Sequence, residues 1–391
     1  MVVVWFSAGK MFSPFEQIKN YLKVDHNKVA TENWLFKLQT KLSLVLVYLG
    51  LLILMSPCVI LRDMPLDCFG PDPKIIPLEF LDAYCFLHGT YIVPEAINLR
   101  VGIDIPFPGI APDGPSTTRL YQFRYIFYPF MLALQIFFIR GSRRVWKFLE
   151  GGRLKYLISE LKIQIAKVDE EKLKKRIDIV TTYMSSNMTF RNSYAYRYVF
   201  CELLIMANLV FQFWLVNSLL DNEYLEFGWK GVRYISSLSK EPSWNDHDKE
   251  IVENPFIRLF PKMTICKIDV AGSSGNVVIH EALCVMTLNN IAEKVFFAMW
   301  FWFMFLAIVS TFGLIYRCSV LFSKRARYME LCLKVDKSVC TREELKNLVD
   351  KYSYGDWFVL SLIQKNTDVW VFPQLLEELL RKMFGKRRKD M

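Results

Sequence analysis

Four long apolar stretches divide this chain. Each is close to the roughly 20 residues that a helix needs to cross the hydrocarbon core of a bilayer. Arg124 lies in the second stretch, and Arg197 and Glu202 lie in the third, all near helix ends where long side chains reach the lipid headgroups. Backbone groups within a bilayer must pair internally, so the pattern predicts four membrane-spanning helices rather than a soluble bundle of four core helices. The stretches cover residues 42–61, 121–139, 196–220 and 295–316.

The segments between these stretches differ in charge. Residues 140–195 carry 13 Lys and Arg, residues 317–391 carry 16, and the first 41 residues carry 6. Residues 62–120 have 4 basic against 8 acidic residues, and residues 221–293 have 7 against 11. Because basic residues accumulate on the cytoplasmic side of membrane proteins, both termini and the middle loop are expected in the cytoplasm. The net charge of +10 therefore indicates contact with anionic lipid and not with nucleic acid.

Four of the nine cysteines lie in the two segments expected outside the cell. An even number of cysteines on the oxidising side predicts two disulfides. Four cysteines allow three pairings, and their spacing does not choose among them. No Cys/His cluster has the spacing of a zinc site, since Cys85 and His88 stand alone. The four cysteines are Cys68, Cys85, Cys266 and Cys284.

The loops contain signals for local structure. Prolines and glycines punctuate the first outer loop, within which residues 78–91 are predicted to form a short helix. A Gly-Ser-Ser-Gly turn at 272–275 predicts a small β-hairpin between residues 263–270 and 276–279. Charge-rich segments with helical spacing predict membrane-proximal cytoplasmic helices at residues 153–192 and 341–383.

The chain carries no P-loop, dinucleotide fingerprint, catalytic-triad spacing or paired carboxylate motif. The sequence therefore predicts neither an enzyme nor a bound cofactor or metal ion. A transporter or receptor is an alternative, but transporters carry internal repeats and broken or charged helices at mid-membrane. Neither feature is evident in the four apolar stretches.

Several motifs resemble those of the innexins, the invertebrate gap-junction proteins related to pannexins. They occur in the family's order along nearly the whole chain, and they look closest to insect members. The motifs are Trp146 to Gly152, Phe260 to Thr264 with Cys266, Leu283 to Val285, Trp300 to Phe303, and Gly355 to Phe358 with Lys365 and Asn366.

The resemblance implies a subunit of a gap junction or hemichannel. Such subunits, eight in known members, ring a central pore for passive passage of ions and small molecules. Two hemichannels of adjacent plasma membranes then dock through their outer loops, and a ring of this kind can contain one innexin or several. The alternatives are a non-junctional hemichannel and a non-conducting four-pass adhesion or scaffold protein.

The expected fold class is an all-α membrane protein whose subunit has four transmembrane helices. Disulfide-stapled extracellular loops with small β-hairpin elements are expected on one side, and a helical cytoplasmic domain on the other. The expected segments are a cytoplasmic N-terminal segment (1–41), the first span (42–61), extracellular loop 1 (62–120), the second span (121–139), a helical cytoplasmic loop (140–195), the third span (196–220), extracellular loop 2 (221–294), the fourth span (295–316) and a helical cytoplasmic tail (317–391).

Resemblance to innexins and pannexins also implies a cysteine pairing. It joins the two outer loops, Cys68 with Cys284 and Cys85 with Cys266. Local pairing within each loop is the competing interpretation. Bridges between the loops are expected to make them rigid enough to present one docking surface.

The chain departs from the innexin pattern at two places. The family's Tyr-Gln-Trp-Val signature, commonly followed by proline, falls on residues 125–128, where Tyr125 and Pro129 alone match. The family's usual N-terminus resembles the sequence from Met11 onward, so residues 1–10 form an extension. This extension is expected to narrow the pore, to be bypassed by initiation at Met11, or to have no effect.

Pore and gating residues are expected at the N-terminal segment and at helix ends. Proline at a helix end shapes packing more often than it serves gating, and charges there commonly sit at headgroup level. Glu202, an acid inside a span, is expected to make an interfacial or inter-helix hydrogen bond. The candidates for the pore or its gate are Met11, Phe12, Pro57, Arg62, Asp63 and Pro129.

Overall fold

A computed structural model describes residues 29–56, 66–70, 76–97, 99, 101–112, 117–159, 170–186, 188–238, 254–272, 274–335, 340–368 and 370–385. The described chain divides into two compact units. Unit 1 takes its residues from the ranges 1–45, 139–208 and 307–391, and unit 2 from 46–138 and 209–306.

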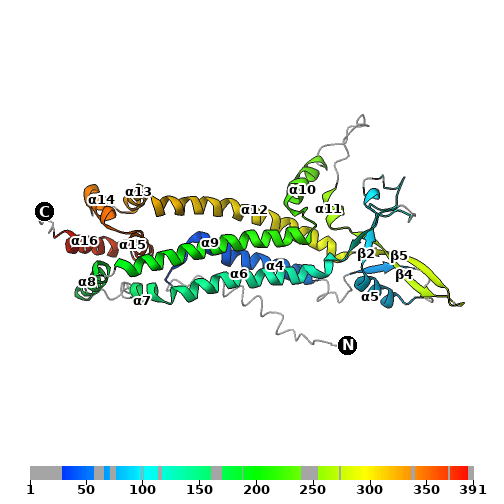
Figure 1. Ribbon diagram of the computed structural model, residues 1–391, viewed down its shortest axis with the longest axis horizontal. Helices are drawn as coiled ribbons and strands as arrows, with labels where there is room; N and C mark the ends of the chain where they lie inside the picture. The colour runs from blue at the N-terminus through cyan, green and yellow to red at the C-terminus, as the bar shows by residue number, and fades with distance from the viewer. Residues whose placement is uncertain are drawn as a thin grey trace. The chain divides into compact units, whose positions relative to one another are not determined.

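Within the described residues, four helices are long and apolar enough to cross a membrane, which confirms the predicted four-pass fold class (Figure 1). Their mean hydropathy lies between 1.3 and 2.1. The first combines α3 (Trp34–Lys37), a π-helical turn η1 (Leu38–Leu42) and α4 (Ser43–Ser56). The others are η4 (Arg124–Phe127) with α6 (Tyr128–Glu150), α9 (Met188–Leu219) and α12 (Thr287–Phe322).

These helices extend beyond the apolar stretches that predicted them. At 36 residues, α12 is roughly 54 Å long, well above the approximately 30 Å of a hydrocarbon core. No proline lies between the end of the fourth apolar stretch at Tyr316 and the end of α12 at Phe322, so helical hydrogen bonding continues past the charged Arg317. The second helix instead begins at Arg124, because Tyr121 and Gln122 belong to a strand.

Unit 2 contains a five-stranded antiparallel sheet with strand order β1-β5-β4-β2-β3. The predicted hairpin forms its centre, and a turn closed by hydrogen bonds between Gly272 and Asn276 and between Gly275 and Gly272 connects its strands. Three short strands from the first loop extend the hairpin on both sides. The strands are β1 (Asp67–Phe69), β2 (Thr90–Ile92), β3 (Leu120–Gln122), β4 (Met263–Ala271) and β5 (Val277–Val285).

Helices in unit 2 flank the sheet and the start of α12. The helix predicted in the first loop is α5 (Leu78–His88), which lies beside the sheet (Figure 1) and contacts β1 and β4. The 3₁₀ turn η3 (Pro94–Ala96) follows β2. Two helices of the second loop were not predicted: α10 (Tyr224–Leu238) and α11 (Pro255–Leu259).

Helix α10 packs closely against α12 because the Trp300 ring of α12 lies against Gly228 of α10. A Cβ on Gly228 would lie 2.0 Å from the Trp300 ring, so the ring occupies space that only glycine leaves open. The Trp300 indole donates a hydrogen bond to the Leu225 carbonyl (3.2 Å), and the Tyr224 hydroxyl donates to the Phe296 carbonyl (3.0 Å). Burial raises the pKa of Tyr224 well above its ordinary value, which keeps this donor protonated.

Unit 1 is helical, as predicted, in the described parts of residues 153–192 and 341–383. Its core surrounds α15, in which nine residues are buried, so this helix is covered on every side. Capping boxes begin α14 at Thr341 and α15 at Ser353. The helices are α7 (Arg153–Ser159), α8 (Glu170–Ser186), α13 (Lys324–Lys334), α14 (Arg342–Lys351), α15 (Tyr354–Asn366) and α16 (Val371–Phe384).

A fully buried ion pair joins α9 to α15 within unit 1. The side chains of Arg191 and Asp356 are 2% and 0% exposed. Arg191 also donates to the carbonyls of Tyr183 (3.2 Å) and Met184 (2.5 Å), and Asp356 accepts from the Ser353 hydroxyl (2.6 Å). These hydrogen bonds offset the cost of removing both charges from water.

Replacing Asp356 with asparagine is expected to lower the free energy of unfolding by about 3–5 kcal/mol, because Arg191 remains buried and charged without its partner. Thermal unfolding of the detergent-solubilised protein measures this change. Asp350→Asn is the matched control, since Asp350 and Lys324 are about half exposed and 3.8 Å apart. The control is expected to change stability by about 0–1 kcal/mol, and equal losses in the two variants would contradict the role of the buried pair.

Candidate functional site

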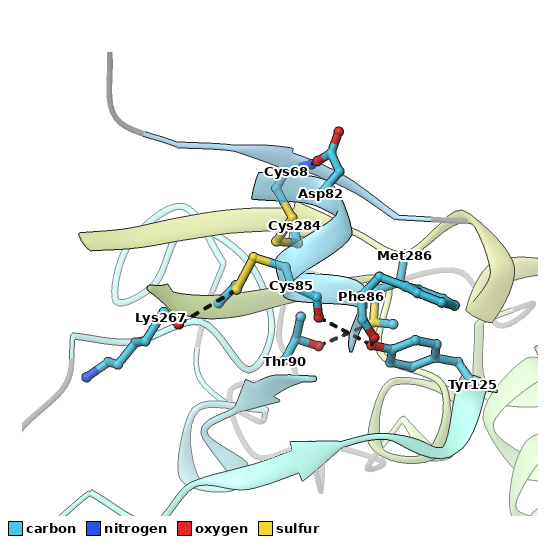
Figure 2. The surroundings of a disulfide bond; sticks show 10 residues. Cys68, Asp82, Cys85, Phe86, Thr90, Tyr125, Lys267, Cys284 and Met286 are labelled. Atoms are coloured by element: carbon cyan, nitrogen blue, oxygen red, sulfur yellow. Dashed lines mark hydrogen bonds between the residues drawn. A yellow bond between two sulfur atoms is a disulfide. The ribbon is translucent and has the colours of Figure 1, made fainter. Parts of the chain in front are cut away.

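Two neighbouring disulfides cross-link unit 2 (Figure 2). Cys68 of β1 is bonded to Cys284 of β5, and Cys85 of α5 is bonded to Cys266 of β4. All four cysteines are buried, with exposed fractions of 5% or less. This is the pairing between the two loops that the family resemblance implies. The sulfur atoms of Cys68, Cys85 and Cys284 lie within 4.8 Å of one another, which reflects the adjacency of the two disulfides.

The strand register brings these cysteines together. Cys68 lies directly opposite Cys284 in the antiparallel pair of β1 and β5. On the other side of β5, Cys284 lies opposite Thr264 of β4, two residues before Cys266. The carboxylate of Asp82 in α5 accepts a hydrogen bond from the Cys68 backbone N–H at 2.7 Å (Figure 2). Helix α5 therefore contacts β1 by a hydrogen bond and β4 by a covalent bond.

Tyr125 fixes the end of α5. Its hydroxyl donates to the carbonyl of Phe86 at 2.8 Å, and the Cys85 carbonyl lies 3.5 Å away (Figure 2). The two aromatic rings of Phe86 and Tyr125 pack with their centroids 5.4 Å apart. Tyr125 is 1% exposed. The tyrosine that remains of the innexin signature thus holds the cross-linked helix from the start of the second span.

Pro129 is the second residue of α6, immediately after the 3₁₀ turn η4. In the first turn of a helix, proline removes an N–H that has no intrahelical partner, and its fixed φ suits the helix. The proline therefore lies at the junction of the 3₁₀ turn and the α-helix, near the start of the span. The gating role suggested for Pro129 stays a prediction.

The remaining pore and gating candidates lie outside the described residues. The roles assigned to them from the sequence stay predictions. They are Met11, Phe12, Pro57, Arg62 and Asp63.

The motif before β4 connects the sheet to α12. Phe260 is fully buried and stacks on Phe296 of α12, with ring centroids 5.8 Å apart. The side-chain amide of Asn289 in α12 donates to the Pro261 carbonyl at 2.9 Å. Met286 in turn donates its backbone N–H to the Lys262 carbonyl at 2.8 Å. The innexin-like residues here are therefore packing and hydrogen-bonding residues that fix the fourth span to the sheet.

Glu202 pairs with Arg317 within unit 1, which is the inter-helix hydrogen bond expected for this acid, although the sequence did not indicate its partner. Both carboxylate oxygens accept from the guanidinium at 2.7 Å, so the pair joins α9 to α12. The guanidinium lies over the Tyr198 and Phe358 rings, at 5.4 and 5.6 Å from their centroids. Arg317 follows the predicted fourth stretch by one residue, and a search for opposite charges at equivalent span ends would have found the pair.

The tail motif holds the chain that enters the first helix. Asn366 accepts from the Ala30 N–H at 2.5 Å and donates to the Ala30 carbonyl at 3.1 Å. Lys365 donates to the Glu32 carbonyl at 3.2 Å. The Asn33 N–H donates to the Tyr198 hydroxyl at 3.1 Å. Residues 30–33 are thereby tied to both the tail and the third span.

Together, four helices of membrane-spanning length and a sheet cross-linked between two loops define a multi-pass membrane protein. A profile of the innexin family matches residues 32–383. Innexin shaking-B of Drosophila melanogaster is 31% identical over 374 residues, which cover 95% of each chain. Innexin inx2 of Schistocerca americana is 30% identical over 378 residues, covering 96% of this chain and 99% of the relative. Innexin inx2 of Drosophila melanogaster is 32% identical over 377 residues, covering 96% and 97%.

The chain therefore belongs to the innexin family, whose members form gap-junction channels and are channel proteins rather than enzymes. The resemblance drawn from the motifs is confirmed.

Tyr125→Phe is expected to lower the free energy of unfolding by about 1–2 kcal/mol, because the buried end of α5 loses its hydroxyl donor. Thermal unfolding in detergent measures the loss. Tyr121→Phe serves as the control, since Tyr121 is 52% exposed and its hydroxyl can bond to water. A Tyr125 variant as stable as this control would show that the hydrogen bond does not hold α5.

Proposed function

We propose that copies of this chain ring a central pore through which ions and small molecules diffuse, and that two rings dock between neighbouring cells. Membership of a family that forms gap-junction channels supports this proposal. A single subunit with four helices has too little interior for a hydrated conduit, whereas a ring of subunits encloses one. Eight subunits are the family expectation, of this chain alone or mixed with other innexins.

The proposed orientation places the sheet outside the cell and both termini in the cytoplasm of the same plasma membrane. Disulfides form and persist on the oxidising side, and both lie in unit 2. Residues 140–195 and 317–391 carry the basic excess typical of cytoplasmic segments. Charge distribution and cysteine chemistry are independent signals, and they support the same orientation.

The observation that carries the docking proposal is the exposed apolar surface of the cross-linked sheet. Phe69 of β1 is 67% exposed, and Val277 and Ile279 of β5 are 68% and 61% exposed. Val277 and Ile279 are two residues apart in a strand, so they lie on one face. Apolar side chains on a water-facing end favour burial against another protein. The disulfides hold the strands that carry them, so this surface keeps its shape before contact.

The membrane itself is the other proposed partner. Large apolar side chains are exposed on both α9 and α12, which favours contact with lipid tails or neighbouring subunits. They include Phe200, Leu203, Val210 and Trp214 of α9, and Phe305, Ile308, Phe312 and Ile315 of α12.

Cells expressing the chain are expected to pass a small dye to a paired cell, and Cys85→Ser is expected to abolish this transfer. The variant frees α5 from β4 and leaves the Cys266 thiol unpaired. Cys318→Ser, which removes an exposed free cysteine, is the matched control and should transfer dye normally. Surface labelling in the same cells separates failed docking from failed delivery.

Currents from unpaired cells distinguish the other possible outcomes. Current without dye transfer in the wild type would identify a non-junctional hemichannel. Surface protein that supports neither current nor transfer would identify an adhesion or scaffold protein. Either result contradicts the proposed junctional role, and normal coupling by Cys85→Ser contradicts the role of the cross-link.

A further inference from the structure

A basic pocket of about 370 Å³ lies between the first and second long helices within unit 1. Thr40 and Leu44 line it from the first helix. Four cationic side chains of α6 line the other side, and the described lining residues include no acid. The four cations are Arg140, Arg143, Arg144 and Lys147.

The cations share one face of α6. Their spacing of three, four and seven residues from Arg140 places them above one another on consecutive turns. Lys41, next to Thr40 on the facing helix, interacts electrostatically with Arg143 and Lys147. Four positive charges thus line one pocket, Lys41 adds a fifth nearby, and like charges at the helical spacing of the four repel one another.

One carboxylate offsets part of this charge. Glu32 pairs with Arg143 at 3.1 Å, and both side chains are largely buried. The described lining of the pocket itself carries only basic charges. An anion that enters the pocket is therefore attracted by the cations and relieves their mutual repulsion.

The first helix is locally widened at this pocket. Thr40 and Lys41 belong to the π-helical turn η1, where the Thr40 hydroxyl donates to the Phe36 carbonyl at 2.7 Å. Single π-helical turns inside α-helices occur frequently at functional sites. Here the turn contains Thr40, which lines the pocket, and Lys41, which interacts electrostatically with two of the cations of α6.

The pocket also lies at a boundary between apolar and charged sequence. Leu44 and Ile139 line it together with the cations, and apolar span residues continue from each. On the side of the pocket away from the charges, the side chains of both helices are predominantly apolar and can contact lipid tails. This arrangement fits a ligand with a negatively charged headgroup and an apolar tail.

We propose that this pocket binds the phosphate group of an anionic ligand. Arginine and lysine are the side chains that bind phosphate oxygens most strongly, arginine through paired N–H groups. An anionic phospholipid headgroup and a free phosphate share this chemistry.

Binding to the full-length protein in neutral detergent tests the proposal. The probes are short-chain phosphatidylinositol 4,5-bisphosphate, inorganic phosphate, and short-chain phosphatidylcholine as a zwitterionic reference. Arg144→Gln with Lys147→Gln removes two exposed cations of the pocket and leaves the Arg143–Glu32 pair intact. This double variant is expected to weaken phosphoinositide binding on the order of thirtyfold, since each basic residue near an anionic headgroup contributes about a factor of five.

The matched control is Lys174→Gln with Lys346→Gln, which removes the same charge from exposed positions on α8 and α14. It is expected to bind as tightly as the wild type. Competition by inorganic phosphate would identify a free phosphate as the ligand, and its failure to compete would identify the lipid headgroup. The proposal is overturned if neither probe binds the wild type, if phosphatidylcholine binds equally, or if the control loses as much affinity as the pocket variant.

Discussion

The disulfides Cys68–Cys284 and Cys85–Cys266 connect positions that are 216 and 181 residues apart in the chain. Strands β1, β2 and β3 have three residues each, which is too short for independent stability. They form a sheet because β4 and β5 provide a longer template and because covalent bonds keep the first loop against it. Bridges over such long loops restrict the unfolded chain strongly, typically stabilising the fold by about 2–4 kcal/mol each. Two hydrogen bonds of α5 add to the disulfides in holding this arrangement: the Cys68 N–H of β1 donates to Asp82, and the Tyr125 hydroxyl donates to the Phe86 carbonyl.

In unit 1, segments that are distant in sequence are held together without disulfide bonds, since its described cysteines are free. Buried ion pairs connect its helices, with Arg191–Asp356 joining α9 to α15 and Glu202–Arg317 joining α9 to α12. Such pairs depend on exact partners, because a buried charge left alone is strongly destabilising. The contacts of Asn366 with Ala30 then tie the tail to the entrance of the first span. In the proposed channel, this link connects the C-terminal helices to the segment nearest the N-terminus.

The sequence was most informative where a physical rule acts over many consecutive residues. Stretches of about twenty predominantly apolar residues have few alternatives to a membrane span. A Gly-Ser-Ser-Gly turn between residues 263–270 and 276–279 likewise has few alternatives to a hairpin. The three-residue strands were missed because they are too short to show a period. Helix α10 was missed because its fit depends on Gly228 accepting the Trp300 ring, a contact between distant residues. Residue chemistry likewise left three cysteine pairings open, and only the family resemblance and then the sheet register distinguished one.

The most direct test of this account is the connectivity of the cysteines in protein from native membranes. Digestion under non-reducing conditions with free thiols blocked, followed by mass spectrometry, identifies which peptides remain joined. The account predicts one linked pair containing Cys68 and Cys284 and another containing Cys85 and Cys266. Peptides joined within a loop, Cys68 with Cys85 or Cys266 with Cys284, would contradict it.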